Sequence, residues 1–315
     1  MSLDKMICIA GPTATGKTEL AVALALALGG EVVSCDSMQV YRRMDIGTAK
    51  PTAAERRGVP HHMLDVAEPD EPMSVGKFTA LAGPVVEDIL ARGKAAILAG
   101  GTGLYLDALV RGNAFPPVPA TGRRQELQAR AQAEGVQPLY QELQRIDPAA
   151  AARIPPGDAK RIIRALEVYL ETGRTITAHN LATQAAPPRY HPVWLGLDFQ
   201  DRAALYRRID LRVEQMLERG LLRELEALLE AGVPPDATAL QAIGYKELLA
   251  VLTEGADLAE AAARIQQASR RYAKRQRTWF RRNPKIQWIV RGEEEDFSSV
   301  FAQAAAHIPF FDTGW

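Results

Sequence analysis

The stretch Gly11-Pro-Thr-Ala-Thr-Gly-Lys-Thr18 constrains the fold more than any other part of this chain, because it matches the pattern G-x-x-x-x-G-K-[ST]. The apolar run Met6–Ala10 before it predicts a buried strand, and the Ala- and Leu-rich residues Lys17–Leu28 predict a helix. In a strand–loop–helix arrangement, backbone N–H groups and the helix N-terminus together attract phosphate oxygens. The motif therefore predicts a phosphate-binding loop, with Lys17 at the phosphates and Thr18 as a ligand of Mg²⁺.

Composition places the chain among ordinary globular proteins. Its 315 residues, 47% hydrophobic and 24% charged, allow a sizeable core in two domains or in one domain with an insertion. The net charge is zero, so a nucleic-acid partner would have to bind a local basic patch. No apolar run reaches transmembrane length and the N-terminus lacks a signal-peptide pattern, which predicts a cytoplasmic protein that does not bind membranes. Cys8 and Cys35 lie in predicted strands, where we expect buried, reduced thiols.

The stretches around the phosphate loop predict a parallel sheet. Glu31–Cys35 predicts a second strand, and a strand–helix–strand unit favours parallel pairing. Similar patterns predict further strands at 94–100, 190–197 and 285–290, and a short edge strand at 59–65. Because ligands bind beyond the carboxyl ends of parallel strands, Asp36 should lie beside the phosphate loop, as should the glycine-rich turn Gly100–Tyr105. The predicted class is α/β, with a P-loop NTPase-like parallel-sheet core.

Helical patterns predict an insertion into this core and a helical C-terminal part. Pro116–Pro119 is typical of a stiff hinge, and the polar, strand-poor residues after it predict a helical insertion domain. The predicted domains are 121–189 for the insertion, and 1–120 with 190–315 for the core and its C-terminal helices. Outside the insertion, helices are predicted at 75–91, 202–231 and 258–282. We expect Gly83-Pro84 to bend or interrupt the first and Gly220 to interrupt the second.

Two basic stretches are candidates for RNA contact. One face of an insertion helix carries three basic side chains at helical spacing, Lys160, Arg161 and Arg164. The second stretch is 270–282, where seven basic residues are interleaved with three aromatics. It fits either a solvated helix face or a surface for phosphates and stacked bases. Tyr272 and Trp279 share a helix face, which favours a place in the core for both.

Three function classes fit a phosphate loop in this setting. A kinase or nucleotide hydrolase usually holds Mg²⁺ through an acidic residue at the end of a neighbouring strand; Asp36 could do this, but the strand that ends at Gly100 carries no acid. A transferase would use the loop to bind a leaving diphosphate, and Asp36 could then act as a base. A non-catalytic RNA-binding protein or GTP switch would explain the basic helix, although no guanine-specifying motif is apparent. The residues alone leave these classes open.

Seven blocks of the sequence nevertheless resemble, in order, those of the tRNA dimethylallyltransferase (tRNA isopentenyltransferase) family. They are 11–18, 36–41, 45–51, 100–105, 164–169, 243–247 and 271–281. The resemblance implies transfer of a dimethylallyl group from dimethylallyl diphosphate to N6 of the adenine 3′ to the anticodon of tRNA, with release of diphosphate. The alternative is a P-loop kinase that phosphorylates a small molecule or a nucleotide. The later blocks are not expected in a kinase.

The resemblance also implies roles for individual residues. Asp36 would accept the N6 proton, Thr102 would lie at the adenine, and Arg212 would assist the diphosphate. The diphosphate would be bound by Gly11, Pro12, Thr13, Ala14, Thr15, Gly16, Lys17 and Thr18, with Mg²⁺ as the cofactor at Thr18. The tRNA would be bound by Asp36, Ser37, Met38, Gln39, Thr102, Arg124, Lys160, Arg161, Ile162, Ile163, Arg164, Gln241, Ala242, Ile243, Gly244, Tyr245 and Lys246. The expected partners are dimethylallyl diphosphate and the anticodon stem-loop of tRNA, bound by a monomer.

Overall fold

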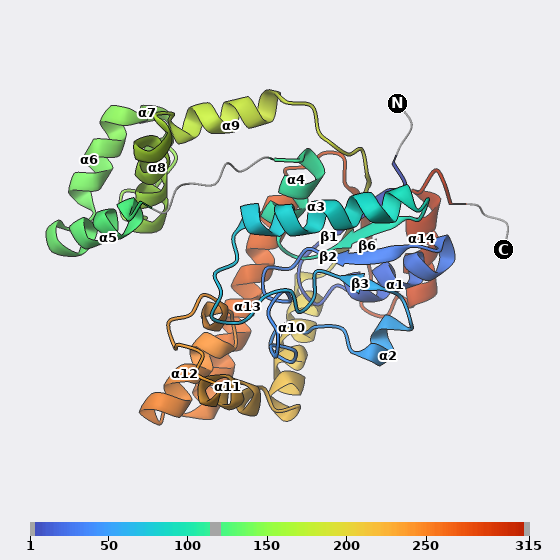
Figure 1. Cartoon of the computed structure of the whole chain (residues 1–315). Helices are drawn as coiled ribbons and strands as arrows, with labels where there is room; N and C mark the ends of the chain where they lie inside the picture. The colour runs from blue at the N-terminus through green and yellow to red at the C-terminus, as the bar shows by residue number, and fades with distance from the viewer. Residues whose placement is uncertain (1–3, 114–120, 312–315) are drawn as a thin grey trace. The chain divides into compact units, whose positions relative to one another are not determined.

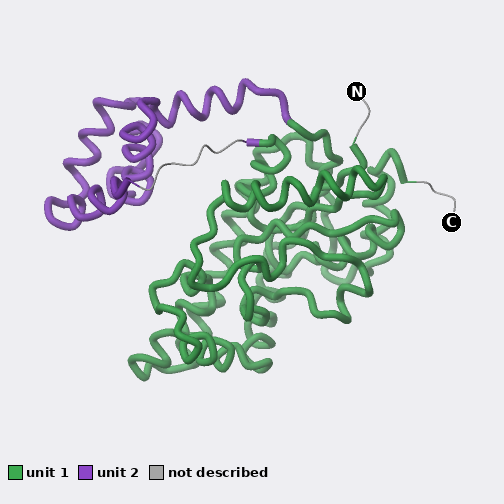
Figure 2. The backbone as a smooth tube through the Cα atoms, in the orientation of Figure 1, with its two compact units in different colours: residues 1–112, 189–315 green, residues 113–188 purple. Residues whose placement is uncertain are grey.

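The computed structural model describes residues 4–113 and 121–311, and the chain divides into two compact units (Figures 1 and 2). The first unit comprises Met1–Gly112 and Arg189–Trp315, and the second comprises Asn113–Pro188. The insertion predicted at 121–189 thus corresponds to the second unit. The proposed hinge at 116–119 lies outside the described residues.

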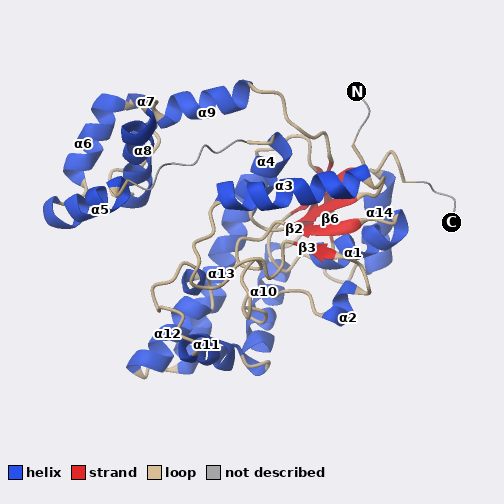
Figure 3. Cartoon of the chain, viewed as in Figure 1, coloured by secondary structure: helices blue, strands red, loops and turns tan. Residues whose placement is uncertain are grey.

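A six-stranded, fully parallel sheet forms the centre of the first unit (Figure 3). Its strands, in spatial order, are β3 (His61–His62), β2 (Glu31–Ser34), β4 (Ala96–Ala99), β1 (Met6–Ala10), β5 (Val193–Phe199) and β6 (Gln287–Arg291). The central strand β1 is buried on both faces, as apolar runs in parallel sheets usually are. The predicted parallel α/β sheet is confirmed, with the edge strand at its predicted place.

Helices cover both faces of this sheet because alternate residues of each strand point to opposite sides (Figure 1). On one face, α1 (Lys17–Leu28) and α14 (Phe297–Ala306) bury apolar side chains against Ile7 and Ile9. On the other, α3 (Val75–Ala91) and α4 (Gly103–Arg111) pack against Cys8 and Leu98. The rings of Phe78 and Tyr105 stack there, with their centroids 4.2 Å apart.

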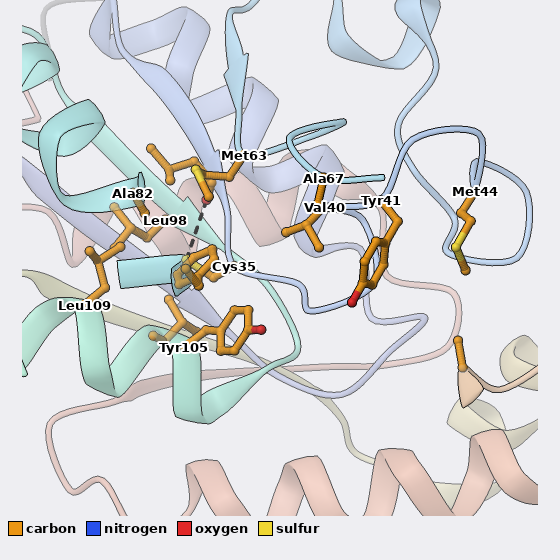
Figure 4. Packing of buried hydrophobic residues seen from close by; sticks show 14 of the residues in the cluster. Cys35, Val40, Tyr41, Met44, Met63, Ala67, Ala82, Leu98, Tyr105 and Leu109 are labelled. Carbon is orange, nitrogen blue, oxygen red and sulfur yellow. Dashed lines mark hydrogen bonds between the residues drawn. The ribbon is translucent and has the colours of Figure 1, made fainter. Parts of the chain in front are cut away.

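Figure 4 shows part of this second layer, with Cys35 among Ala82 of α3, Leu98 of β4 and Leu109 of α4. Both cysteines are buried and unbonded to each other, as expected. The helix predicted at 75–91 is confirmed with the same bounds, but the interruption expected at Pro84 is wrong, because the helix continues through this residue. Pro84 is exposed, so water can reach the carbonyl group that its missing N–H leaves without a donor.

The C-terminal part of the first unit is helical. It contains α10 (Arg202–Glu218), α11 (Leu221–Glu230), a 3₁₀ turn (Ala239–Gln241), α12 (Tyr245–Glu254) and α13 (Leu258–Phe280), while the short α2 (Ala53–Arg56) lies earlier in the chain. The predicted interruption at Gly220 is confirmed, since α10 ends and α11 begins there. No helix in the described ranges combines the length and hydropathy needed to cross a bilayer.

The second unit has a hydrophobic core of its own. It contains α5 (Arg123–Glu134), α6 (Gln137–Ile146), α7 (Pro148–Ala151), α8 (Ala159–Thr172) and α9 (Ile176–Ala185). Asp147 and Asp158 accept hydrogen bonds from the first turns of α7 and α8, which explains where these helices begin. Leu143 and Leu166 are among the side chains buried at its centre.

Candidate active site

The phosphate-loop motif lies between β1 and α1, so the predicted strand–loop–helix arrangement is confirmed. The loop folds around the carbonyl oxygen of Pro12, which accepts hydrogen bonds from the Thr15 hydroxyl at 2.9 Å and from the Lys17 ammonium at 2.6 Å. The first backbone N–H groups of α1 have no acceptor within the helix. The loop therefore presents backbone donors beside a lysine, the arrangement that binds phosphate groups elsewhere.

A cavity of about 760 Å³ opens in the first unit over this loop. It brings together segments that are far apart in the sequence. Its lining includes 13–18 of the loop, Asp36 after β2, Gly100 and Gly101 after β4, Arg208 and Arg212 of α10, and Tyr272 and Gln276 of α13. The expected meeting of Asp36 and the phosphate loop at one edge of the sheet is therefore confirmed.

The turn after β2 holds the Asp36 carboxylate in place. Asp36 Oδ1 accepts hydrogen bonds from the backbone N–H groups of Met38, at 2.9 Å, and Gln39, at 3.4 Å. Thr102, directly before α4, accepts a hydrogen bond from Ser37 N at 3.0 Å and donates one to Ser37 Oγ at 3.2 Å. The structure thus links Thr102 to the residue next to Asp36.

Positive charge accumulates around the phosphate loop. Arg212 Nη1 lies 3.4 Å from Thr13 Oγ1, and Arg208 donates to the Ala14 carbonyl oxygen at 3.2 Å. Desolvation, and then repulsion by Arg212, lowers the pKa of Lys17 to about 7, while the Asp36 carboxylate opposes the shift. Desolvation also lowers the pKa of Arg212. Cations crowded in this way favour a polyanion as the ligand.

Helix α13 contributes two cavity residues whose role the sequence did not indicate. Gln276 is only 4% exposed and lies in a run of basic residues, where nothing in the local pattern marks it. The core position expected for Tyr272 and Trp279 is wrong: Tyr272 lines the cavity, and Trp279 is 38% exposed. Their helix face meets the glycine turn at Gly101–Gly103, and Trp279 Nε1 donates to Asp107 Oδ2 at 2.9 Å.

The model of a protein family described as IPP transferase matches residues 39–283. The chain belongs to the IPP transferase family. It is 50% identical, over 284 residues, to the tRNA dimethylallyltransferase of Thermomicrobium roseum, covering 90% of this chain and 85% of that protein. It is 47% identical over 301 residues to the tRNA dimethylallyltransferase of Geobacter sulfurreducens, covering 96% of both proteins.

Solved structures agree with this IPP transferase assignment. The full-length tRNA isopentenylpyrophosphate transferase of Bacillus halodurans superposes with a TM-score of 0.71 at 43% identity, covering 96% of this chain and 94% of the other. A eukaryotic dimethylallyltransferase described as acting on tRNA superposes with a TM-score of 0.80 at 31% identity, covering 96% and 76%. The family resemblance and the P-loop NTPase-like fold are confirmed, and the transferase is favoured among the three classes.

Not all residues assigned to tRNA in this IPP transferase have accessible side chains. Ile162 and Ile163 of α8 are 0% and 7% exposed and form part of the core of the second unit. Only the basic members of that block can therefore offer their side chains to RNA. Arg164 and Arg124 both donate to Glu167 Oε2 at 2.8 Å, so these two arginines already share one carboxylate.

The block 241–246, which was also assigned to tRNA binding, likewise contains buried residues. Tyr245 is fully buried, and its hydroxyl donates to Glu224 Oε1 at 2.5 Å. Ala242 and Gly244 are also buried, whereas Gln241 and Lys246 are exposed. The buried part of the block supports the loop at 45–51, because Glu224 also accepts hydrogen bonds from three backbone N–H groups of that loop.

Proposed function

We propose that this protein transfers a dimethylallyl group from dimethylallyl diphosphate to N6 of the adenine 3′ to the anticodon in tRNA, releasing diphosphate. The observation that carries the proposal is that Asp36 lines the same cavity as the phosphate loop and its cations. The relatives of Thermomicrobium roseum and Geobacter sulfurreducens are named tRNA dimethylallyltransferases, which supports the choice of donor and acceptor. Every described residue that lines the cavity belongs to the first unit.

Stabilising the charge on the leaving diphosphate is a larger demand on the site than activating the adenine amine. As the bond between C1 of the prenyl group and the diphosphate oxygen breaks, its electron pair moves onto the diphosphate. Preorganised donors oppose that growing negative charge most effectively in a cavity that excludes water. The loop N–H groups, Lys17 and Arg212 would provide this stabilisation. A bound diphosphate would also return Lys17 to its charged form, since a nearby anion raises the pKa of an ammonium group.

The acceptor requires a base. The lone pair of adenine N6 is delocalised into the ring, so the amine becomes a good nucleophile only as its proton leaves. Asp36 would accept that proton while the N6–C1 bond forms. Its carboxylate is held by the backbone of Met38 and Gln39, which preserves its orientation before the substrate binds. An adenine in a single-stranded loop reaches such a pocket at little cost, because it is already unpaired.

The side chains near the loop fit Mg²⁺. Thr18, Glu19 and Asp36 line the cavity and offer the oxygen ligands that Mg²⁺ prefers. In the described parts of the chain, no three His, Cys, Asp or Glu side chains form a metal cage. An ion held by Thr18 would thus share the substrate's phosphate oxygens, as Mg²⁺ commonly does. It would neutralise part of the diphosphate charge.

Mass analysis of an RNA product tests the proposed function. The protein is incubated with dimethylallyl diphosphate, Mg²⁺ and an anticodon stem-loop that carries adenine at the target position. We expect the RNA to gain one dimethylallyl group and an equal amount of diphosphate to appear. A stem-loop with inosine at that position lacks the N6 amine and should remain unmodified. ATP consumption without any change in the RNA would contradict the proposal and favour the kinase.

A further inference from the structure

The Gln276 side chain of α13 connects two loops that are far apart in the sequence. Its Oε1 accepts a hydrogen bond from the Thr13 backbone N–H at 2.9 Å, and its Nε2 donates to the Gly101 carbonyl oxygen at 2.9 Å. Gln276 is only 4% exposed, and its contact with Gly101 is buried while its contact with Thr13 is partly buried. A buried amide needs such partners, and losing one would leave an unsatisfied polar group.

The glycines after β4 make this approach possible. A Cβ atom on Gly101 would lie 2.1 Å from Gln276 Nε2, and one on Gly103 would lie 2.2 Å from Trp279 Cδ1. At both distances a side chain in place of the hydrogen atom would force the α13 side chain to shift. The glycines at these two positions are therefore explained by the close packing of α13, without any contact with phosphate.

The contact with Thr13 also orients Lys17. The peptide group between Pro12 and Thr13 is planar, so its N–H and C=O point in opposite directions. When Gln276 holds the Thr13 N–H, the Pro12 carbonyl oxygen must face the other way. There it accepts the hydrogen bonds from Thr15 and Lys17. Gln276 thus controls the carbonyl that holds the loop lysine.

The contact with Gly101 connects Gln276 to the part of the site proposed to bind the adenine acceptor. Gly101 directly precedes Thr102, which bonds to Ser37, the neighbour of Asp36. One amide therefore joins the loop that would bind the leaving diphosphate to the Gly101–Thr102 turn, and Thr102 in turn bonds to the neighbour of the proposed base. Transfer between two substrates requires both to be held in an aligned geometry, and misplacement by about 1 Å can cost 100-fold in rate.

We infer that Gln276 is a positioning residue for the transfer reaction, setting the phosphate loop against the Gly101–Thr102 turn through the Thr13 N–H and the Gly101 carbonyl. The inference rests on the proposed function. It predicts that loss of the bridge lowers kcat and weakens binding of the donor, while binding of the RNA stem-loop is largely preserved.

Gln276→Met, which keeps the length of the side chain but removes both hydrogen bonds, tests this inference. We expect kcat/KM for dimethylallyl diphosphate to fall about 10- to 100-fold, with both kcat and the donor KM affected. Gln276→Glu keeps an acceptor for Thr13 but places a carboxylate oxygen against the Gly101 carbonyl, so it should also be impaired. Gln266→Met on the same helix is the matched control and should behave as wild type.

A double-mutant cycle with Gly101→Ala separates positioning from a general loss of stability. The added methyl group forces the Gln276 amide away, so Gly101→Ala should reproduce the kinetic defect of Gln276→Met. Because both changes break one bridge, the double variant should be little worse than either single variant. Additive losses, or variants with a lowered unfolding temperature but unchanged kinetic constants, would overturn the inference.

Calorimetric measurement of inorganic diphosphate binding distinguishes failure of the proposed function from failure of the positioning role of Gln276. We expect Gln276→Met to bind diphosphate more weakly than wild type and Gln266→Met to bind it equally well. If wild type binds diphosphate but modifies no RNA, the proposed function fails by itself. If wild type modifies RNA and Gln276→Met equals it in transfer and in diphosphate binding, the positioning role alone is refuted.

Discussion

At the scale of single residues, the cavity contains charges of opposite sign with different tasks. Lys17 and Arg212 face the position proposed for the diphosphate, and desolvation works against the charge of both. Asp36 belongs to the neighbouring turn, where two backbone amides hold one of its oxygens. The two cations can thus bind an anionic ligand, and the carboxylate can accept a proton.

Asp36→Asn should reduce kcat by about 100- to 10,000-fold, the usual contribution of a general base. The amide oxygen can still accept from Met38 N, so the turn should keep its shape and RNA affinity should change little. Single-turnover transfer and stem-loop binding would be measured together, with the exposed Asp236→Asn as the matched control. Near-normal turnover in Asp36→Asn would remove this residue from the role of base.

The lowered pKa of Lys17 predicts proton uptake when diphosphate binds. The free site holds a lysine with a pKa of about 7, and a bound anion raises that pKa. The affinity for diphosphate should therefore fall as the pH rises above 7, because each binding event must then recover a proton. Titration calorimetry at pH 8, in buffers of different ionisation enthalpy, measures the uptake. Lys17→Arg stays charged throughout, and equal uptake by this variant would contradict the assignment to Lys17.

At the scale of elements, the loop between Asp45 and Pro51 depends on α11. Glu224 accepts from Asp45 N and Ile46 N at 2.8 Å each, from Gly47 N at 3.1 Å and from the Tyr245 hydroxyl. Ile46 and neighbouring residues of the loop line the cavity. The Glu224 carboxylate thus anchors the loop at 45–51, which lines the active-site cavity, to α11 and α12. These two helices come much later in the chain than the loop.

Glu224→Gln should weaken the anchoring of the loop at 45–51. An amide offers one acceptor oxygen in place of two, so some of the four donors around Glu224 would lose their partner. We expect the free energy of unfolding to fall by about 2 kcal/mol, and the donor KM to rise several-fold. Urea denaturation and steady-state kinetics would test this. Glu226→Gln on the exposed side of the same helix should change neither quantity, and equal effects in both variants would refute the anchoring role.

At the scale of the whole molecule, the net charge is zero, so RNA binding must depend on local basic surfaces. The second unit exposes Lys160 and Arg161 on α8. Arg161 Nη1 lies 3.4 Å from Asp158 Oδ2, and Arg164 is paired with the less exposed Glu167. A phosphate contact by an exposed basic side chain releases counterions, and binding then weakens with salt. The exposed pair is therefore the best place to test whether this unit binds the stem-loop.

The double variant Lys160→Glu/Arg161→Glu should bind the stem-loop more weakly and with a shallower dependence on salt, by about one unit of slope per lost phosphate contact. Affinities would be measured between low and physiological salt. Arg145→Glu/Arg174→Glu, an equal change of charge elsewhere in the same unit, is the control. An unchanged slope in the α8 variant would count against the second unit as an RNA clamp.

Much of the fold followed from patterns that are local in the sequence. The strand–loop–helix at 6–28 and the break at Gly220 were both predicted correctly. Each depends on the backbone preference or capping chemistry of a few adjacent residues, which do not change with the rest of the fold. The helix at 75–91 was also predicted, but whether Pro84 would interrupt it depended on the exposure of that position, which the sequence did not reveal.

The sequence by itself determined a phosphate loop beside Asp36 on a parallel sheet, because the order and periodicity of the strands decide which ends meet. Only the tertiary structure decided that Gln276 joins this loop to the turn at Gly101, that the partly exposed Trp279 packs against Gly103 and that Tyr245 is buried against Glu224. These contacts join residues that are far apart along the chain. Their partners become adjacent only after the helices pack, so no local pattern could have indicated them.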